Sequence, residues 1–138
     1  IIPDIPPEES DDGYWDHCKK YQLAPIPLVS PISSSSRLKK IKEKAAGGFV
    51  YCVSTLGTTG MNAQFDSETV KYLQRIKSEF DLPLAVGFGI SSPEQSNALR
   101  GVAEIAIIGS ATIRQIKNAE IKGRIDSAIE YLSGFNRQ

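Results

Sequence analysis

Short apolar runs alternate along this chain with segments whose apolar residues recur every three or four positions. The runs predict buried strands at 1–5, 24–30, 49–53, 84–86 and 104–108. The periodic segments predict helices at 8–23, 37–46, 68–80, 93–100 and 119–135. Strands and helices that alternate in units of about 20 to 30 residues favour a parallel sheet with its helices on the outside.

The stretch 82–95, LPLAVGFGISSPEQ, joins a strand to a helix through a glycine turn. Ser92 is expected to be the N-cap, Pro93 the first helical residue, and Gln95 the partner that completes a capping box. Glycines let a ligand approach the backbone, and a helix N-terminus offers free N–H groups that suit a phosphate. The same glycines also fit a plain turn. The stretch is not a dinucleotide fingerprint, because Ser92 stands where that fingerprint needs glycine.

Two further predicted strands also end in glycine next to small hydroxyl residues. The strand at 49–53 runs into STLGTTG at 54–60, and the strand at 104–108 runs into GSAT at 109–112. Neighbouring loops that follow the last strands are the usual phosphate site of a (β/α)8 barrel, where a short extra helix supplies N–H donors. We therefore expect a phosphate site built from these three loops, with 110–115 as the extra helix.

Charge and composition argue against several other classes of function. The 138 residues carry 16 basic and 16 acidic side chains, so nothing favours a polyanion or a membrane surface as a partner. Four lysines between 39 and 44 form a basic cluster, but without interleaved aromatic residues we expect a solvated helix face and no nucleic-acid binding. No apolar run approaches the roughly 20 residues of a transmembrane helix, and we expect no signal peptide.

Candidate catalytic and metal-ligating side chains are few. The only histidine, His17, is expected on an exposed helix face, and no second ligand is spaced for a metal site. Cys18 and Cys52 are expected to be buried free thiols, which favours a reducing, cytoplasmic setting. Asp4 lies near the end of the strand predicted at 1–5 and has two possible roles. It is either a polar group at the rim of a site or a carboxylate that holds the next loop by hydrogen bonds, and the second role is favoured.

The length of the chain limits the fold. A closed (β/α)8 barrel needs about 250 residues, so 138 residues correspond to about half a barrel. The chain starts with isoleucine, which suggests truncation or processing upstream. Because half a barrel leaves two sheet edges open, we expect it to bind its other half or to self-associate. The final helix carries Ile121, Ile125, Ile129 and Leu132 on one face, which we expect to pack in the core rather than to form a groove for a partner.

Several strings together resemble one family, the alpha subunit of tryptophan synthase. They occur in that family's order over essentially the whole chain: PDIPPEES at 3–10, APIPLVSP at 24–31, GFVYCVSTLGTTG at 48–60, PLAVGFGISSPEQ at 83–95 and AIIGSATI at 106–113. The resemblance covers the second half of the family's barrel. It implies an α/β fold, a single domain over 1–138 with about five parallel strands and outer helices, and the absence of the barrel's N-terminal strands from this chain.

The resemblance also implies an activity. The family is a carbon–carbon lyase of tryptophan biosynthesis, which cleaves indole-3-glycerol phosphate to indole and glyceraldehyde 3-phosphate without a metal or a bound cofactor. The proton transfers of such a retro-aldol reaction need positioned carboxylates. In the family these lie on the second strand and its loop, a segment that this sequence lacks. No catalytic residue is therefore assigned, and we expect the fragment alone to be inactive.

Seven positions match the substrate-binding positions of the family. They are Gly60, Gly89, Gly109 and Ser110 for the phosphate, Thr59 for the lid's hydrogen bond to the catalytic aspartate, and Tyr51 and Phe88 for the pocket around the indole and glycerol. The two aromatic residues fit a core role as well, and the threonine fits a turn. The lid at 54–65 departs from the family, since Thr55 replaces its usual arginine and 61–64 lacks the A-E-N-R pattern.

The family's partner is a β subunit that carries pyridoxal phosphate, forms an α2β2 complex and receives indole through a tunnel. Pro6 and Pro7 lie on the side where the family meets this partner. Two other hypotheses stay open. One is a non-catalytic phosphate-binding module that binds or activates a β subunit. The other is a related (β/α)8 enzyme that acts on different sugar phosphates, against which the string GFGISSPEQ argues.

Overall fold

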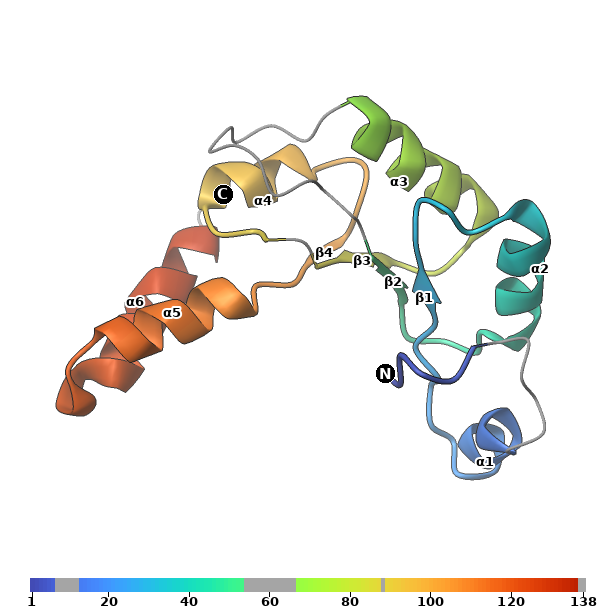
Figure 1. The fold of residues 1–138 in the computed structure, drawn as a ribbon, viewed down its shortest axis with the longest axis horizontal. Helices are drawn as coiled ribbons and strands as arrows, with labels where there is room; N and C mark the ends of the chain where they lie inside the picture. Colours follow the sequence, from blue (N-terminus) through green and yellow to red (C-terminus); the bar gives the residue numbers. More distant parts are fainter. Residues whose placement is uncertain (7–12, 54–66, 88, 137–138) are drawn as a thin grey trace.

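A computed structural model describes residues 1–6, 13–53, 67–87 and 89–136. In this part of the chain four parallel strands form one sheet in sequence order: β1 (Leu28–Val29), β2 (Val50–Cys52), β3 (Leu84–Val86) and β4 (Ile105–Ala106). Tyr51 pairs with Leu28 on one side and with Ala85 on the other. Since all four strands run in the same direction, their carboxyl ends meet at one edge of the sheet (Figure 1).

The helices alternate with the strands, as the sequence pattern predicts. They are α1 (Tyr14–Lys20), α2 (Ser35–Lys44), α3 (Ser67–Glu79), α4 (Pro93–Ala98), α5 (Ser110–Asn118) and α6 (Arg124–Ser133), with 3-10 turns at Ile121–Gly123 and Gly134–Asn136. Figure 1 shows α2 and α3 together beside one part of the sheet. On the other side, α5 and α6 run next to each other and extend away from β4.

The hydrophobic core lies between the sheet and these helices. Its buried members are Val29, Leu38, Ile41, Val50, Cys52, Tyr72, Leu73, Ile76, Phe80, Leu84, Val86, Ile90 and Leu99. All three residues of β3 are buried, as expected for the central strands of a parallel sheet. Each large aliphatic side chain buried here contributes about 1.5–3 kcal/mol, so α2 and α3 hold β1, β2 and β3 in place by apolar packing.

The N-terminus of α4 confirms the predicted capping box. The N–H of Gln95 donates to the hydroxyl of Ser92 at 3.4 Å. In return the side-chain Oε1 of Gln95 accepts the N–H of Ser92 at 3.2 Å and the N–H of Ser91 at 2.7 Å. Pro93 occupies the first turn. These bonds set the direction in which the chain leaves β3 and its glycine turn.

The N-terminal segment is not the predicted strand. Residues 1–6 contain a turn at Pro3 and Asp4, and Ile1 and Ile2 are exposed. Proline has no N–H to donate to a strand ladder, so the prolines of this short segment leave few donors for pairing. The expectation of five strands is therefore wrong for the described chain. Leu23, the last residue of the helix predicted at 8–23, lies beyond α1, which ends at Lys20, and is exposed.

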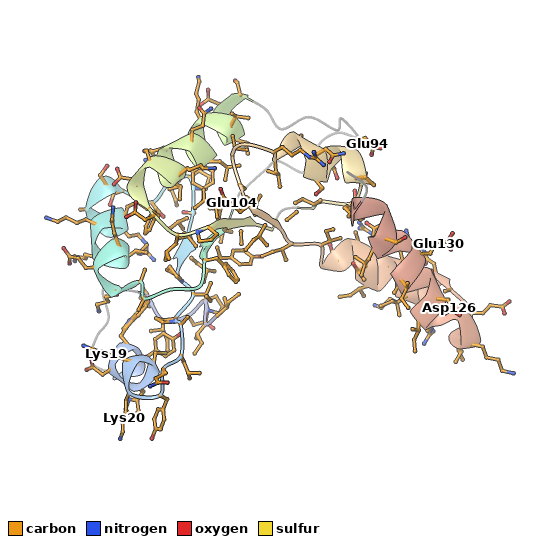
Figure 2. All side chains as sticks on the ribbon, turned by 180° about the vertical axis from the view of Figure 1, so that it is seen from behind. Lys19, Lys20, Glu94, Glu104, Asp126 and Glu130 are labelled. Atoms are coloured by element: carbon orange, nitrogen blue, oxygen red, sulfur yellow. The ribbon has the colours of Figure 1, made fainter. Side chains whose placement is uncertain are left out.

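The apolar face of the final helix is exposed rather than buried in the core. The exposed fractions are 81% for Ile121, 76% for Ile125, 62% for Ile129 and 39% for Leu132. The half-buried residues of α6 are instead those on its other side, which packs along α5. Figure 2 shows the labelled acidic side chains of α6 pointing into solvent as well. The expectation of core packing is wrong because a repeat of three and four positions defines a face without defining what covers it.

Candidate functional site

A cavity of about 180 Å³ opens at the carboxyl edge of the sheet, where β2, β3 and β4 end. Its lining residues are Tyr51, Gly87, Gly89, Ile90, Ile107, Gly109 and Ser110. Four of these were predicted from the sequence as site residues, and the fold brings them together from three separate strand ends. The other three predicted residues, Thr59, Gly60 and Phe88, lie outside the described residues.

Three of the lining residues were missed by the sequence analysis. Gly87 belongs to the glycine turn, so its place in the turn could have marked it as a lining residue. Ile90 belongs to the turn between β3 and α4, and Ile107 lies just beyond β4. Both are ordinary apolar residues, and no local pattern distinguishes them from core residues. Their place at the cavity depends on strand register, since Ile107 follows β4 directly and its N–H donates to the carbonyl of Val86 at 2.8 Å.

Two glycines of the cavity wall are required by the local geometry. At Gly89 the backbone adopts φ +59°, a left-handed conformation that favours glycine. At Gly87 a side chain would overlap the hydroxyl of Tyr51 and lie 2.8 Å from its ring carbon Cζ. The Tyr51 ring therefore occupies space that only glycine leaves open, which places this ring against the turn between β3 and α4.

The N-terminus of α5 faces the same cavity. The helix begins at Ser110 with Gly109 as its N-cap, and no described side chain caps this end. The N–H groups of a first helical turn have no acceptor within the helix, and they carry the positive end of the helix dipole. Apart from its chain neighbours, no atom of the described residues would lie within 4 Å of a Cβ atom at Gly109, so the described residues leave the space next to these donors open. The arrangement suits a small anion such as a phosphate group.

The described wall of the cavity contains no carboxylate, histidine or thiol. Asp4 is exposed in its turn and does not line the cavity. The described part of the site can therefore bind and orient an anion, but it offers no side chain that would serve as a general acid or base near neutral pH. A second cavity of about 20 Å³, between the N-terminal segment and α1, is too small for a ligand.

The other candidate side chains lie away from this cavity. His17 is exposed on α1, and its Nδ1 lies 2.7 Å from the carbonyl oxygen of Gly13 within the same segment. Lys39, Lys40 and Lys42 are exposed on α2, as predicted for a solvated face, whereas Lys44 is half-buried with its Nζ 5.5 Å from the centroid of the Trp15 ring. Figure 2 shows two further lysines, Lys19 and Lys20, projecting from α1 at the end of the molecule opposite to α6.

The two cysteines are buried free thiols, as predicted. Burial raises the pKa of the Cys52 thiol to about 12. No group of three or more histidine, cysteine or acidic side chains that could hold a metal ion occurs among the described residues. None of the helices in the described ranges is long and apolar enough to cross a membrane.

The fold and the cavity together define a class of protein, a parallel α/β protein with a cavity at the carboxyl ends of its strands, where (β/α)8 barrels have their active sites. The sequence profile of the family described as tryptophan synthase alpha chain matches residues 1–136. This chain belongs to that family.

Known relatives agree with this assignment and show how much of the family fold is present. The tryptophan synthase alpha chain of Desulfotalea psychrophila is 44% identical over 116 residues, which are 84% of this chain and 45% of that protein. The alpha chain of Bacillus subtilis strain 168 is 42% identical over 128 residues, 93% of this chain and 46% of that protein. This chain thus spans about half the length of the curated relatives that it matches.

Solved structures give the same result. A crystal structure of the tryptophan synthase alpha chain from Legionella pneumophila superposes with a TM-score of 0.82 at 32% identity, over 98% of this chain and 49% of that one. The tryptophan synthase α2β2 complex of Pyrococcus furiosus includes a chain that superposes with a TM-score of 0.81 at 27% identity, over 97% of this chain and 53% of that one. The four-stranded parallel sheet with its helices therefore corresponds to half of a (β/α)8 barrel.

Proposed function

We propose that this chain is the phosphate-binding half of a tryptophan synthase alpha chain. In the complete enzyme, indole-3-glycerol phosphate would be cleaved to indole and glyceraldehyde 3-phosphate in a retro-aldol reaction. Family membership supports the reaction class. The observation that carries the proposal for this chain is the single cavity that gathers Tyr51, Gly89, Gly109 and Ser110 from three strand ends.

In this proposal the phosphate binds against the N–H groups at the start of α5, next to Gly109. The open space beside this glycine and the uncapped helix end support the placement. Tyr51 would border the rest of the substrate, at the β2 side of the cavity. Phe88, Thr59 and Gly60 would complete the site as the family resemblance implies.

The chemical step would need groups from the other half of the barrel. Cleavage requires a proton delivered to indole C3 and a proton removed from the hydroxyl of the glycerol carbon bonded to it. The bond that breaks joins indole C3 to this glycerol carbon. The described cavity wall has no carboxylate or histidine for these transfers. This chain would therefore bind and orient the substrate, and it would show no turnover alone.

A second candidate function is a non-catalytic phosphate-binding module that binds or activates a β subunit. The lack of an acid or base in the described cavity wall favours it. Both candidates include a pyridoxal-phosphate-carrying β subunit as partner, which the α2β2 complex of the Pyrococcus furiosus relative supports. Both also include a cytoplasmic location, which the two free thiols favour.

The phosphate site is tested by the substitution Gly109→Ala. Because no described residue beyond its chain neighbours has an atom within 4 Å of the added methyl group, the fold should tolerate it, whereas a bound phosphate would lose its space. We expect the dissociation constant for inorganic phosphate, measured from amide shifts in NMR titrations, to rise about tenfold. Gly123→Ala is the matched control, since its methyl group also meets none of the non-neighbouring described residues within 4 Å but lies outside the cavity. Equal affinity in wild type and Gly109→Ala would contradict the placement.

The two candidate functions differ in what the complete protein does. Indole release from indole-3-glycerol phosphate should be measured with this chain, a β subunit and a separately supplied N-terminal half of a relative's barrel. Turnover that requires both halves supports the lyase. Stimulation of the β subunit by this chain alone, with no indole released under any combination, supports the module.

A further inference from the structure

The side chain of Tyr72 connects α3 to the carboxyl ends of two strands. Its hydroxyl donates toward the carbonyl oxygens of Val29, 3.0 Å away, and Val53, 3.1 Å away. Val29 is the last residue of β1, and Val53 follows β2 directly. The N–H of Val53 itself donates to the carbonyl of Val29 at 2.7 Å. The hydroxyl therefore lies where the two strands end, at the edge of the sheet that carries the cavity.

A second side chain of α3 holds the turn that follows β1. The Nη2 atom of Arg75 donates to the carbonyl oxygens of Pro31, 3.3 Å away, and Ser33, 3.1 Å away. Ser33 is buried, and its hydroxyl accepts the N–H of Ser30 at 3.0 Å. Tyr72 and Arg75 are three positions apart and so lie on one side of the helix. One helix thus binds the backbone of both strand ends at four carbonyl groups.

Apolar side chains also hold α3 against the sheet. The apolar residues Leu73, Ile76 and Phe80 anchor the helix in the core, and a phenyl ring in place of the phenol would occupy nearly the same volume. The hydroxyl is buried with its ring, of which 7% is exposed, and burial raises its pKa well above the ordinary value. A buried polar group of this kind is costly unless it is bonded, so its two carbonyl contacts tie α3 to both strand ends.

We propose that Tyr72 is a positioning residue for the ligand pocket, which acts by holding the carboxyl end of β2 and thereby the ring of Tyr51, and that Arg75 does the same for the turn after β1. Tyr51 lies in β2, two residues before Val53, and its ring fills the space beside Gly87 in the cavity wall. A shift of the strand end would move this ring within the cavity. This inference rests on the proposed function in one respect only, that the ligand of the pocket carries a phosphate group.

The test compares Tyr72→Phe with the control Tyr21→Phe in this chain. Tyr21 is the exposed C-cap residue of α1, and no described hydrogen bond joins its hydroxyl to a strand end, so the control removes a hydroxyl that the described strand ends do not use. Amide hydrogen exchange would be followed at Val53 and at Ile107, which follows β4 and whose N–H donates to the carbonyl of Val86 in β3. We expect exchange at Val53 to accelerate about tenfold in Tyr72→Phe with Ile107 unchanged, and no change in the control.

Phosphate affinity supplies a second readout that a merely structural role would not alter. We expect the dissociation constant of Tyr72→Phe for inorganic phosphate to rise about three- to tenfold while the wild type and Tyr21→Phe bind alike. Arg75→Lys keeps the positive charge but cannot reach both carbonyl groups, so it should accelerate exchange at Ser33 and leave Val53 unchanged.

The outcomes separate the two proposals. Equal acceleration at Val53 and Ile107, or unchanged phosphate affinity in Tyr72→Phe beside a binding wild type, overturns the positioning role. A wild type that does not bind phosphate refutes the proposed function. In that case selective acceleration at Val53 still supports Tyr72 as the residue that positions β2, and uniform acceleration overturns it.

Discussion

The contact between Gly87 and Tyr51 allows the geometry of the pocket to be tested by a pair of substitutions. In Gly87→Ala the added methyl group would overlap the Tyr51 hydroxyl and would lie 2.8 Å from Cζ and 3.4 Å from Cε1 of the ring. Carbon atoms in proteins pack at about 3.5–4.0 Å, so the ring must move. It belongs to β2, which is paired on both sides, and a shift of the backbone would therefore disturb two strand ladders.

The expected loss of unfolding free energy depends on which atoms of Tyr51 the added methyl group would overlap. Inserting a methyl group into a packed site costs about 1–3 kcal/mol of unfolding free energy, and we expect Gly87→Ala to fall in this range. Removing only the hydroxyl, in Tyr51→Phe, relieves the worst contact but leaves Cζ 2.8 Å from the methyl group, so rescue should be partial. Tyr51→Leu removes all the atoms in conflict. In that background Gly87→Ala should cost about 0.5 kcal/mol or less.

The assay is urea unfolding followed by circular dichroism for the four variants of the double-mutant cycle, together with phosphate titration of each. The reasoning predicts a coupling of about 1–2 kcal/mol between the two positions. If Gly87→Ala destabilises the chain equally with tyrosine or leucine at 51, the side chain of Tyr51 is not what excludes a residue at 87. If Gly87→Ala changes neither stability nor phosphate affinity, the ring does not pack against the turn at all.

Three further predictions concern capping, acid stability and thiol reactivity. Ser92→Ala should lower the free energy of unfolding by about 1 kcal/mol through loss of the capping box, whereas Ser96→Ala in the same helix should change it by less than half of that. Lys77 at 2.7 Å and the N–H of Leu84 at 2.8 Å hold the pKa of Glu104 below its ordinary value of 4.5. The stabilisation by its carboxylate is therefore present above pH 4.5 and is lost as the pH falls through the lower folded-state pKa. Glu104→Gln should reduce this loss of unfolding free energy at acidic pH, measured in unfolding curves at a series of pH values. Cys52 is fully buried with a pKa of about 12, so a thiol reagent at pH 8 should modify it no faster than the chain opens, and rapid labelling of the folded chain would contradict its burial.

Much of the architecture was accessible from the sequence because its signals are local. The capping box of Ser92 and Gln95 joins residues three positions apart, so neighbouring letters suffice to predict it. The alternation of strands with helices predicts a parallel sheet, and a parallel sheet brings strand ends to one edge. This is why the loops that carry Gly89, Gly109 and Ser110 could be grouped before their positions were known, whereas Tyr51 was assigned to the site only by the family resemblance.

What the sequence determined by itself is therefore the order of elements, the caps and turns that begin and end them, and the family to which they belong. Only the tertiary structure decided which faces are covered. The stripe on α6 follows a helical period yet is exposed, and the segment 1–6 forms a turn rather than a strand. The contact of Gly87 with Tyr51, and the reach of Tyr72 to a carbonyl 43 positions away, also depend on packing between distant segments. Periodicity and propensity act over a few residues, whereas burial and long-range hydrogen bonds depend on which segments the whole fold brings together.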